Sequence, residues 1–206
     1  MVRDVVEAIQ GTSSEKPVPN PDLNGILSAF PDETLTGLHM KRLTLIRHAK
    51  SSWKEKGLAD FDRPLNARGR SDAPLMGRRL AARGEMPDLV ICSPARRAVA
   101  TMKKIAREAG FPPCRIVEDE RMYPADADEL LRIVREIADC HDDVVLCGHN
   151  PGLTEFSNLV SNHFIDNIPT CGVVAIDFRL DSWKAVVPGS GELRYLDWPK
   201  RIGDPD

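Results

Sequence analysis

The sequence predicts an α/β protein of three layers, a three-layer α/β/α sandwich in which a mostly parallel β-sheet carries helices on both faces. Short apolar runs that are typical of buried strands alternate along the chain with longer segments whose apolar residues recur at helical spacing. Such alternation is typical of βαβ units, which build parallel sheets. The 206 residues are enough for one domain of this kind and some additional chain.

The first 40 residues differ from the rest of the chain. They contain Ser and Pro at several positions and only two short apolar clusters, Val5-Val6 and Ile26-Leu27. We therefore expect residues 1–40 to be a poorly ordered N-terminal extension and residues 41–206 to form the folded domain. Met40, directly before the first expected strand, is also a plausible alternative start.

Six short segments rich in apolar residues are expected to be strands. The last of them is expected to lie at an edge of the sheet. The expected strands are residues 43–47, 88–92, 116–117, 144–148, 172–178 and 192–198.

Four longer segments are expected to be helices. In residues 70–83 apolar side chains, among them Met76 and Leu80, recur at helical spacing. Ser93 followed by Pro94 predicts a helix start, with serine as the N-cap and proline at the first helical position. The expected helices are residues 70–83, 93–109, 126–140 and 152–163.

Composition and charge exclude several classes of protein. Hydrophobic residues make up 42% of the chain and charged residues 29%, which is ordinary for a globular protein. The net charge of −3 disfavours a general nucleic-acid binder, because binding to the phosphate backbone needs a broad basic face. Any positive charge that binds phosphate must therefore be local.

The cysteines and the hydropathy pattern favour a cytoplasmic protein. The five cysteines show no C-x-x-C spacing, and most lie in apolar runs, so we expect buried thiols in a reducing compartment. No stretch approaches the ~20 apolar residues that span a bilayer, and no secretory signal pattern is found at the N-terminus. No membrane partner is expected. The cysteines are at positions 92, 114, 140, 147 and 171.

Basic residues and histidines follow three of the expected strands. Arg47 and His48 follow the first strand, Arg96 and Arg97 the second, and His149 the fourth. In a parallel sheet these junctions meet at one edge, where ligands of α/β proteins bind. Arginine can grip an oxyanion in a forked geometry, and the helix N-termini nearby add donors and positive dipole ends. The sequence therefore predicts a pocket for a phosphoryl group.

Each of these features, taken alone, also has a purely structural interpretation. Ser93-Pro94 can be a simple helix cap, Arg96 and Arg97 can belong to a solvated face, and residues 148–151 can be a turn. A zinc site is another alternative, with ligands drawn from His48, His149, His141 and His163. No H-E-x-x-H or paired Cys/His spacing supports it, and adjacent arginines would repel a cation.

The chain resembles the histidine phosphatase superfamily over about residues 41–200. Three motifs occur in order, each at an expected strand end. Alanine stands where the glycine of the R-H-G signature is usual. The matching residues are Arg47-His48-Ala49 followed by Ser51 and Trp53, then Ser93-Pro94 with Arg97-Ala98 and Thr101, and finally Gly148-His149.

Within the superfamily the chain is most similar to the small phosphohistidine phosphatases of the SixA type. The run R-H-A-K-S-S-W and the run D-R-P-L-N-x-R-G at residues 62–69 are characteristic of these proteins. The phosphoglycerate mutases of the superfamily carry Glu-Ser after R-H-G and Asn after the Trp. Lys50 and Lys54 stand at those places here, which disfavours mutase activity.

The resemblance implies a metal-independent phosphatase without a cofactor, in which His48 is the nucleophile and is transiently phosphorylated. Arginines nearby are expected to keep His48 neutral, and its second ring nitrogen is expected to donate to a backbone carbonyl. Motif register assigns phosphate binding to Arg97 rather than Arg96. The residues expected to bind substrate are Arg47, Ser51, Arg97, His149 and Asn150.

The proton donor to the leaving group is expected in the segment at residues 118–123. Glu120 in Glu-Arg-x-Tyr is the candidate, because that segment resembles the one that carries the acid in the mutase branch. Asp119 and Asp126 are alternatives, and a solvated acidic loop is the structural interpretation.

The sequence leaves three functions open. The first is a phosphatase acting on phosphohistidine in a partner protein, and the second uses the same chemistry on a small phosphate ester. Inorganic phosphate would be the product of both. The third is a non-catalytic phosphate-binding module. The short span between Arg97 and His149 leaves little room for a lid, so we expect a shallow pocket that favours a phosphate carried on a protein.

Overall fold

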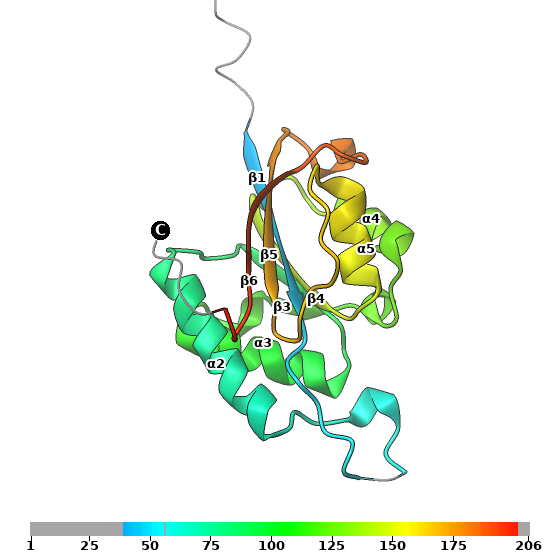
Figure 1. Ribbon diagram of the computed structural model, residues 1–206. Helices are drawn as coiled ribbons and strands as arrows, with labels where there is room; N and C mark the ends of the chain where they lie inside the picture. The colour runs from blue at the N-terminus through cyan, green and yellow to red at the C-terminus, as the bar shows by residue number, and fades with distance from the viewer. Residues whose placement is uncertain (1–38, 56, 202–206) are drawn as a thin grey trace, which may run out of the picture. The chain divides into compact units, whose positions relative to one another are not determined.

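Six strands form one mixed sheet in the computed structural model, which describes residues 39–55 and 57–201 (Figure 1). The strand order is β3-β2-β4-β1-β5-β6. The first four strands in this order are parallel. Strand β5 pairs antiparallel with β1, and β6 pairs antiparallel with β5 and lies at an edge as predicted. The strands are β1 (Met40–Arg47), β2 (Leu89–Cys92), β3 (Ile116–Glu118), β4 (Asp143–Gly148), β5 (Val173–Arg179) and β6 (Glu192–Asp197).

In the described part of the chain four α-helices cover the sheet, α2 and α3 on one face and α4 and α5 on the other (Figure 1). The predicted three-layer α/β class is therefore confirmed. Four short 3-10 helices lie in the connections. The α-helices are α2 (Ala67–Ala82), α3 (Arg96–Ala109), α4 (Ala127–Arg135) and α5 (Gly152–Val160), and the 3-10 helices are η1 (Asp60–Asp62), η2 (Pro113–Arg115), η3 (Glu120–Met122) and η4 (Trp183–Ala185).

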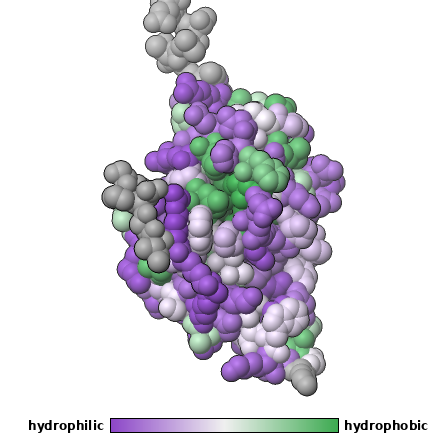
Figure 2. Space-filling model, viewed as in Figure 1, coloured by the Kyte–Doolittle hydropathy of each residue, from purple (hydrophilic) through white to green (hydrophobic). Residues whose placement is uncertain are grey.

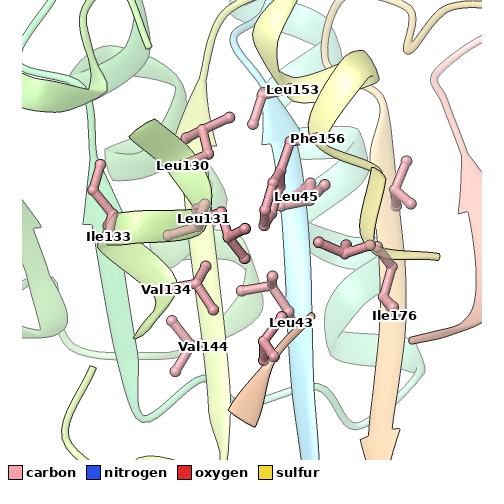
Figure 3. Packing of buried hydrophobic residues seen from close by; sticks show 14 of the residues in the cluster. Leu43, Leu45, Leu130, Leu131, Ile133, Val134, Val144, Leu153, Phe156 and Ile176 are labelled. Atoms are coloured by element: carbon pink, nitrogen blue, oxygen red, sulfur yellow. The ribbon is translucent and has the colours of Figure 1, made fainter. Parts of the chain in front are cut away.

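Two hydrophobic cores hold the layers together, one on each face of the sheet. Side chains alternate along a strand, so Leu43 and Leu45 of β1 face α4 and α5, whereas Ile46 faces α2 and α3. Figure 3 shows Leu43 and Leu45 packed among residues of α4 and α5, such as Val134 and Phe156. All three β1 residues are fully buried, and truncation of such a side chain to alanine costs about 2–5 kcal/mol.

The helix boundaries differ from those that the sequence predicts. Helix α4 ends at Arg135 instead of 140, because the chain beyond it is held by other contacts: Lys41 Nζ donates to Asp139 O, and the backbone N–H of Trp183 donates to the Asp139 carboxylate. Helix α5 ends at Val160 instead of 163, since Ser161 pairs with Gly191.

The start of α2 fixes the chain that follows β1. Asn66 is the N-cap of α2, and its side chain accepts a hydrogen bond from Gly69 N. The backbone N–H of Asn66 donates to Lys50 O at 3.0 Å. A Cβ on Gly69 would overlap that same carbonyl oxygen, so only glycine allows this approach. The segment between β1 and α2 is thereby held beside the carboxyl end of β1.

The predicted N-terminal extension, residues 1–40, lies outside the described residues except for His39 and Met40. Met40 is the first residue of β1 rather than part of an extension. Within the described residues no helix is long and apolar enough to cross a bilayer. Hydrophilic residues cover most of the face in Figure 2.

All five cysteines are free. Cys92, Cys147 and Cys171 are buried in the sheet and the chain next to it, as expected. Cys114 and Cys140 are exposed, because they lie in the connections that precede β3 and β4.

Candidate active site

The predicted junctions lie together at one edge of the sheet. Arg47 ends β1, Arg97 lies in the first turn of α3 after β2, and His149 follows β4. Arg97 joins the two histidines: its Nε lies 3.3 Å from His48 Nε2 and its Nη2 lies 3.2 Å from His149 Nδ1. The rings of His48 and His149 are 5.0 Å apart between centroids. The structure therefore brings all four of these residues to one site.

The ring of His48 is fixed with Nε2 toward the site. Its Nδ1 lies 2.8 Å from Ala49 O, and a carbonyl oxygen can only accept, so Nδ1 carries the proton. Burial, followed by the charges of Arg97, Arg47 and Arg63, lowers the pKa of His48 to about 4. The sequence predicts that neighbouring arginines keep the His48 ring neutral, but burial is the larger cause of the lowered pKa. His48 is neutral at pH 7 and presents a lone pair on Nε2.

Arg47 has a buried donor that faces no partner. Its Nη1 donates to Ile168 O at 2.7 Å and to Asn167 Oδ1 at 3.3 Å, which fixes the guanidinium. Its Nε is buried and has no hydrogen-bond partner among the described residues. Burial lowers the pKa of Arg47, although an arginine stays charged. A buried, unpaired N–H on a cation is costly unless an anion comes to accept it.

The two adjacent arginines of α3 have opposite environments. Arg97 is buried between the histidines, whereas Arg96 is exposed. Thr101 lies one turn further along α3: its hydroxyl donates to Arg97 O at 2.6 Å and accepts from the backbone N–H of Ala49 at 3.0 Å. Thr101 thus joins α3 to the chain that carries His48.

His149 is held between Arg97 and Ser93. Its Nδ1 accepts from Arg97, so Nε2 carries the proton and donates to Ser93 Oγ at 2.8 Å. Burial, His48 and Arg97 together lower the pKa of His149 to about 3. The prediction that Ser93 is the N-cap of α3 is wrong. Ala95 holds that position without a side-chain bond. Ser93 directly follows β2, where its backbone N–H donates to Cys147 O, and its hydroxyl lies next to His149.

Three further residues belong to the site and are missed by the sequence-based reasoning. Asp60 accepts from Arg97 Nη2 at 2.8 Å, from Tyr123 Oη at 2.7 Å and from Arg63 Nη1 at 2.6 Å. The ring of Tyr123 packs edge-on against His149, with centroids 5.1 Å apart. Arg63 is buried and stacks on the exposed ring of Trp53.

The signals for these residues are present in the sequence. Arg63 belongs to the D-R-P-L-N run and Asp60 precedes it by three residues, a spacing at which opposite charges pair. Tyr123 belongs to the Glu-Arg-x-Tyr segment in which Glu120 is the predicted acid. Gly152 lets the start of α5 pack closely against that segment, because a Cβ on Gly152 would overlap the backbone oxygen of Ala125, two residues beyond Tyr123.

The acidic candidates for proton donation lie elsewhere. Glu120 is exposed and borders a surface hollow that Ile91 and Val117 also line, and no contact joins it to the histidines among the described residues. Asp119 pairs with Arg121 at 2.8 Å. Asp126 caps α4 by accepting from the backbone N–H of Glu129.

The two other residues expected to bind substrate are engaged by the protein. Ser51 Oγ accepts from Arg63 Nη2 at 2.6 Å. Asn150 Nδ2 donates to Asn167 Oδ1 at 2.9 Å and to Ile168 O at 3.2 Å, the same two oxygens that accept from Arg47. In this structure both residues therefore support the arginines of the site.

Of the four histidines of the zinc alternative, the structure brings only His48 and His149 together. His141 precedes β4 and His149 follows it, so they lie at opposite ends of that strand, and His163 is exposed beyond the end of α5. Among the described residues no three His, Cys, Asp or Glu side chains are grouped as metal ligands.

The segment that borders the site also differs from expectation. The sequence predicts little room for a lid in the chain between Arg97 and His149. Residues 57–63, between β1 and α2, instead supply the rim through Asp60, whose side chain is 45% exposed, and Phe61, whose ring packs edge-on against Tyr123.

Comparison with known proteins agrees with this geometry. Residues 43–143 match the family model of the histidine phosphatase superfamily, branch 1. An uncharacterized chloroplastic protein of Arabidopsis thaliana is 30% identical over 171 residues, which cover 77% of this chain and 78% of the relative.

Solved structures share the fold. The Agrobacterium tumefaciens protein named phosphohistidine phosphatase SixA is 26% identical, with a TM-score of 0.63 over 76% of this chain and 96% of that one. A protein of Nakamurella multipartitia, also named phosphohistidine phosphatase SixA, has a TM-score of 0.65 at 22% identity over 79% of this chain and 98% of that one.

A parallel sheet edge with two facing histidines and buried arginines defines an α/β protein built to handle phosphoryl groups. The chain matches the family model and is similar to the relatives named above, so it belongs to the histidine phosphatase superfamily, and its fold is of the SixA type. This membership supports a phosphatase function.

Proposed function

We propose that this protein is a metal-independent phosphatase that removes phosphate from phosphohistidine on a partner protein by way of a phosphorylated His48. One arrangement carries the proposal: Arg97 lies between His48 and His149 while the buried Nε of Arg47 has no partner among the described residues. Together these groups fit the three outer oxygens of a phosphoryl group.

In the first step His48 Nε2 attacks phosphorus and the bond from phosphorus to the leaving nitrogen breaks. The electron pair of that bond stays on the leaving imidazole, which takes a proton from water. Arg47 and Arg97 stabilise the charge on the phosphoryl oxygens, which is the main task in phosphoryl transfer. Their guanidinium groups supply the positive charge that a metal ion supplies in other phosphatases.

His149 changes its role when the phosphoryl group binds. In the free protein its Nδ1 accepts from Arg97. The negative charge of a bound phosphoryl group opposes the effects that lower the pKa of His149, so that Nδ1 can take up a proton and donate to an oxygen. Ser93 holds the ring in place through Nε2.

In the second step water attacks phospho-His48. The bond between phosphorus and Nε2 breaks, inorganic phosphate is released, and the electron pair returns to Nε2. The hydrogen bond from Nδ1 to Ala49 O keeps the ring oriented through both steps. Covalent catalysis thereby divides one displacement into two easier ones.

The absence of a suitable acid supports phosphohistidine as the substrate. Among the described residues the only carboxylate bound to this cluster is Asp60, and its pKa is about 2: burial raises the value, but hydrogen bonds from Tyr123, Arg63 and Arg97 lower it further. Asp60 is therefore ionised at pH 7 and cannot donate a proton. An alcohol leaves poorly without a donor, whereas an imidazole can take its proton from solvent.

The rim supports a substrate carried on a protein. Trp53 is 73% exposed next to Arg63, and Lys50 and Lys54 are exposed in the same segment. Such a rim is open to a large partner rather than closed around a small one. The free cysteines support action in a reducing compartment, as in the cytoplasm.

The proposal is tested by a panel of substrates in the presence of EDTA. The panel contains a phosphohistidine protein, a phosphohistidine peptide, para-nitrophenyl phosphate and an alkyl phosphate. We expect release of phosphate that is fastest from phosphohistidine and is lost in His48→Ala. Preference for the alkyl ester would favour the small-ester alternative, and phosphate binding without turnover of any substrate would favour a non-catalytic module.

A further inference from the structure

We infer that Asp60 is a positioning residue of this site: it orients Arg97 toward the phosphoryl group and limits the positive charge of the site, so that phosphate can leave. The inference rests on the proposed phosphatase function and explains why a carboxylate lies in a pocket that has to bind an anion.

The contacts of Asp60 fix Arg97 at two points. Arg97 Nη1 donates to the backbone oxygen of Asp60 at 2.5 Å, and Arg97 Nη2 donates to its carboxylate at 2.8 Å. Asp60 is itself fixed, because Arg63 donates to one carboxylate oxygen and Tyr123 to the other. The orientation of Arg97 thus depends on the short helix η1 at the rim.

The other contacts of Arg97 are longer and point to the histidines. Its Nε lies 3.3 Å from His48 Nε2, and its Nη2 lies 3.2 Å from His149 Nδ1. Neutral nitrogens are weaker acceptors than phosphoryl oxygens, so a bound phosphoryl group replaces these two contacts. The bonds to Asp60 remain, and they hold the guanidinium in position while the ligand changes.

Asp60 also sets the charge of the site. Arg47, Arg63 and Arg97 contribute three positive charges, and both histidines are neutral at pH 7. The carboxylate of Asp60 lowers the net charge of the site to +2, which balances a phosphoryl dianion. Without Asp60 the site would hold the product phosphate more tightly.

The test measures catalysis and phosphate binding separately in full-length protein. Turnover of a phosphohistidine peptide gives kcat and KM, and calorimetry with inorganic phosphate gives Kd. The variants are Asp60→Asn, which removes the charge, and Asp60→Glu, which keeps it. Asp62→Asn is the matched control, because it removes the same charge from an exposed side chain of the same 3-10 helix.

We expect Asp60→Asn to lower kcat by about 10- to 100-fold, less than the loss of a whole oxyanion donor. Its Kd for phosphate should fall by up to about 10-fold, since the site gains positive charge at a partly exposed position. Asp60→Glu should recover part of kcat, and Asp62→Asn should behave as wild type.

A purely structural role for Asp60 would move both quantities in the same direction. Weaker phosphate binding in proportion to the loss of kcat would therefore overturn the inference, as would wild-type kcat in Asp60→Asn. Wild-type protein that binds phosphate but turns over no substrate would overturn the proposed function and this inference with it. An active wild type with an equally active Asp60→Asn would overturn the inference alone.

Discussion

Arg97 Nε lies 3.3 Å from His48 Nε2, the ring nitrogen that the backbone leaves free for chemistry. A guanidinium in contact with that nitrogen disfavours its protonation and stands next to the place where a phosphoryl group would bind. One contact thus serves both the nucleophile and the electrophile.

Arg97 and Arg96 should differ sharply when each is replaced by alanine. Arg97→Ala removes a donor to the phosphoryl oxygens, so kcat/KM should fall by about 10²- to 10³-fold, or roughly 3–4 kcal/mol. Arg96→Ala removes an exposed side chain and should cost less than about 1 kcal/mol. Steady-state kinetics of both variants on the same substrate checks this, and equal or reversed losses would contradict the assignment.

Glu120 should matter little for phosphohistidine. Glu120 is exposed and borders the surface hollow that Ile91 also lines, without a contact to the histidines among the described residues. Glu120→Gln should therefore leave turnover of a phosphohistidine peptide within about twofold of wild type, because the leaving imidazole takes its proton from solvent.

The same variant tests the small-ester alternative. If alkyl esters are the natural substrates and Glu120 is their acid, Glu120→Gln should slow them by roughly 10²- to 10⁴-fold, or about 3–5 kcal/mol. Fast hydrolysis of an alkyl ester that depends steeply on Glu120 would refute phosphohistidine as the substrate. Tyr123→Phe is a useful comparison, since the phenol does contact the site through Asp60.

His48 should stay neutral well below pH 6.5. Its pKa is lowered to about 4, so the ring gains a proton only as the pH falls through that value. Nitrogen NMR of the His48 ring should show the Nδ1–H form unchanged from pH 7.5 to 5, with His48→Gln used to assign the signals. Titration with a midpoint near 6.5 would show that burial and the arginines do not act as described.

The lowered histidine pKa values also make stability depend on pH. Unfolded histidine binds a proton near pH 6.5, whereas folded His48 and His149 bind one near 4 and 3. The unfolding free energy should therefore fall as the pH falls from about 6.5, by up to ~1.4 kcal/mol per pH unit for each histidine. Urea unfolding of wild type and His48→Gln at pH 7 and 5 measures this, and a smaller pH effect in the variant is expected.

The domain boundary can be tested by truncation. The first strand begins at Met40, and the six strands of the sheet lie within the described residues. A chain that starts at Met40 should keep its thermal unfolding transition and its turnover of para-nitrophenyl phosphate. Loss of both would show that residues 1–39 are an integral part of the domain.

The sequence is sufficient for the fold class and for the residues that form the strand ends. Apolar runs and helical spacing locate the strands and helices, and the rule that parallel strand ends share one edge brings Arg47, His48 and His149 together. The choice of Arg97 over Arg96 comes from motif register, and the burial of Arg97 agrees with it.

Other parts of the site depend on tertiary contacts that local patterns do not carry. Asp60 and Tyr123 are 63 residues apart in the chain and are joined by a hydrogen bond from the phenol to the carboxylate. Gly69 of α2 and Gly152 of α5 pack closely against Lys50 O and Ala125 O in the chain near each of them. Ser93 has the pattern of a helix cap, but its hydroxyl instead meets His149, which is 56 residues away in the chain. Helix ends are likewise decided by such contacts, as Asp139 shows beyond α4.

The most direct test of the account is to trap the phosphorylated protein. Wild type is mixed with a phosphohistidine protein, quenched within milliseconds at alkaline pH, where phosphohistidine survives, and digested for mass spectrometry. The account predicts a transient phosphoryl group on the peptide that contains His48, and neither this signal nor turnover in His48→Ala. Turnover that proceeds without phosphate on His48, or that persists in His48→Ala, would contradict it.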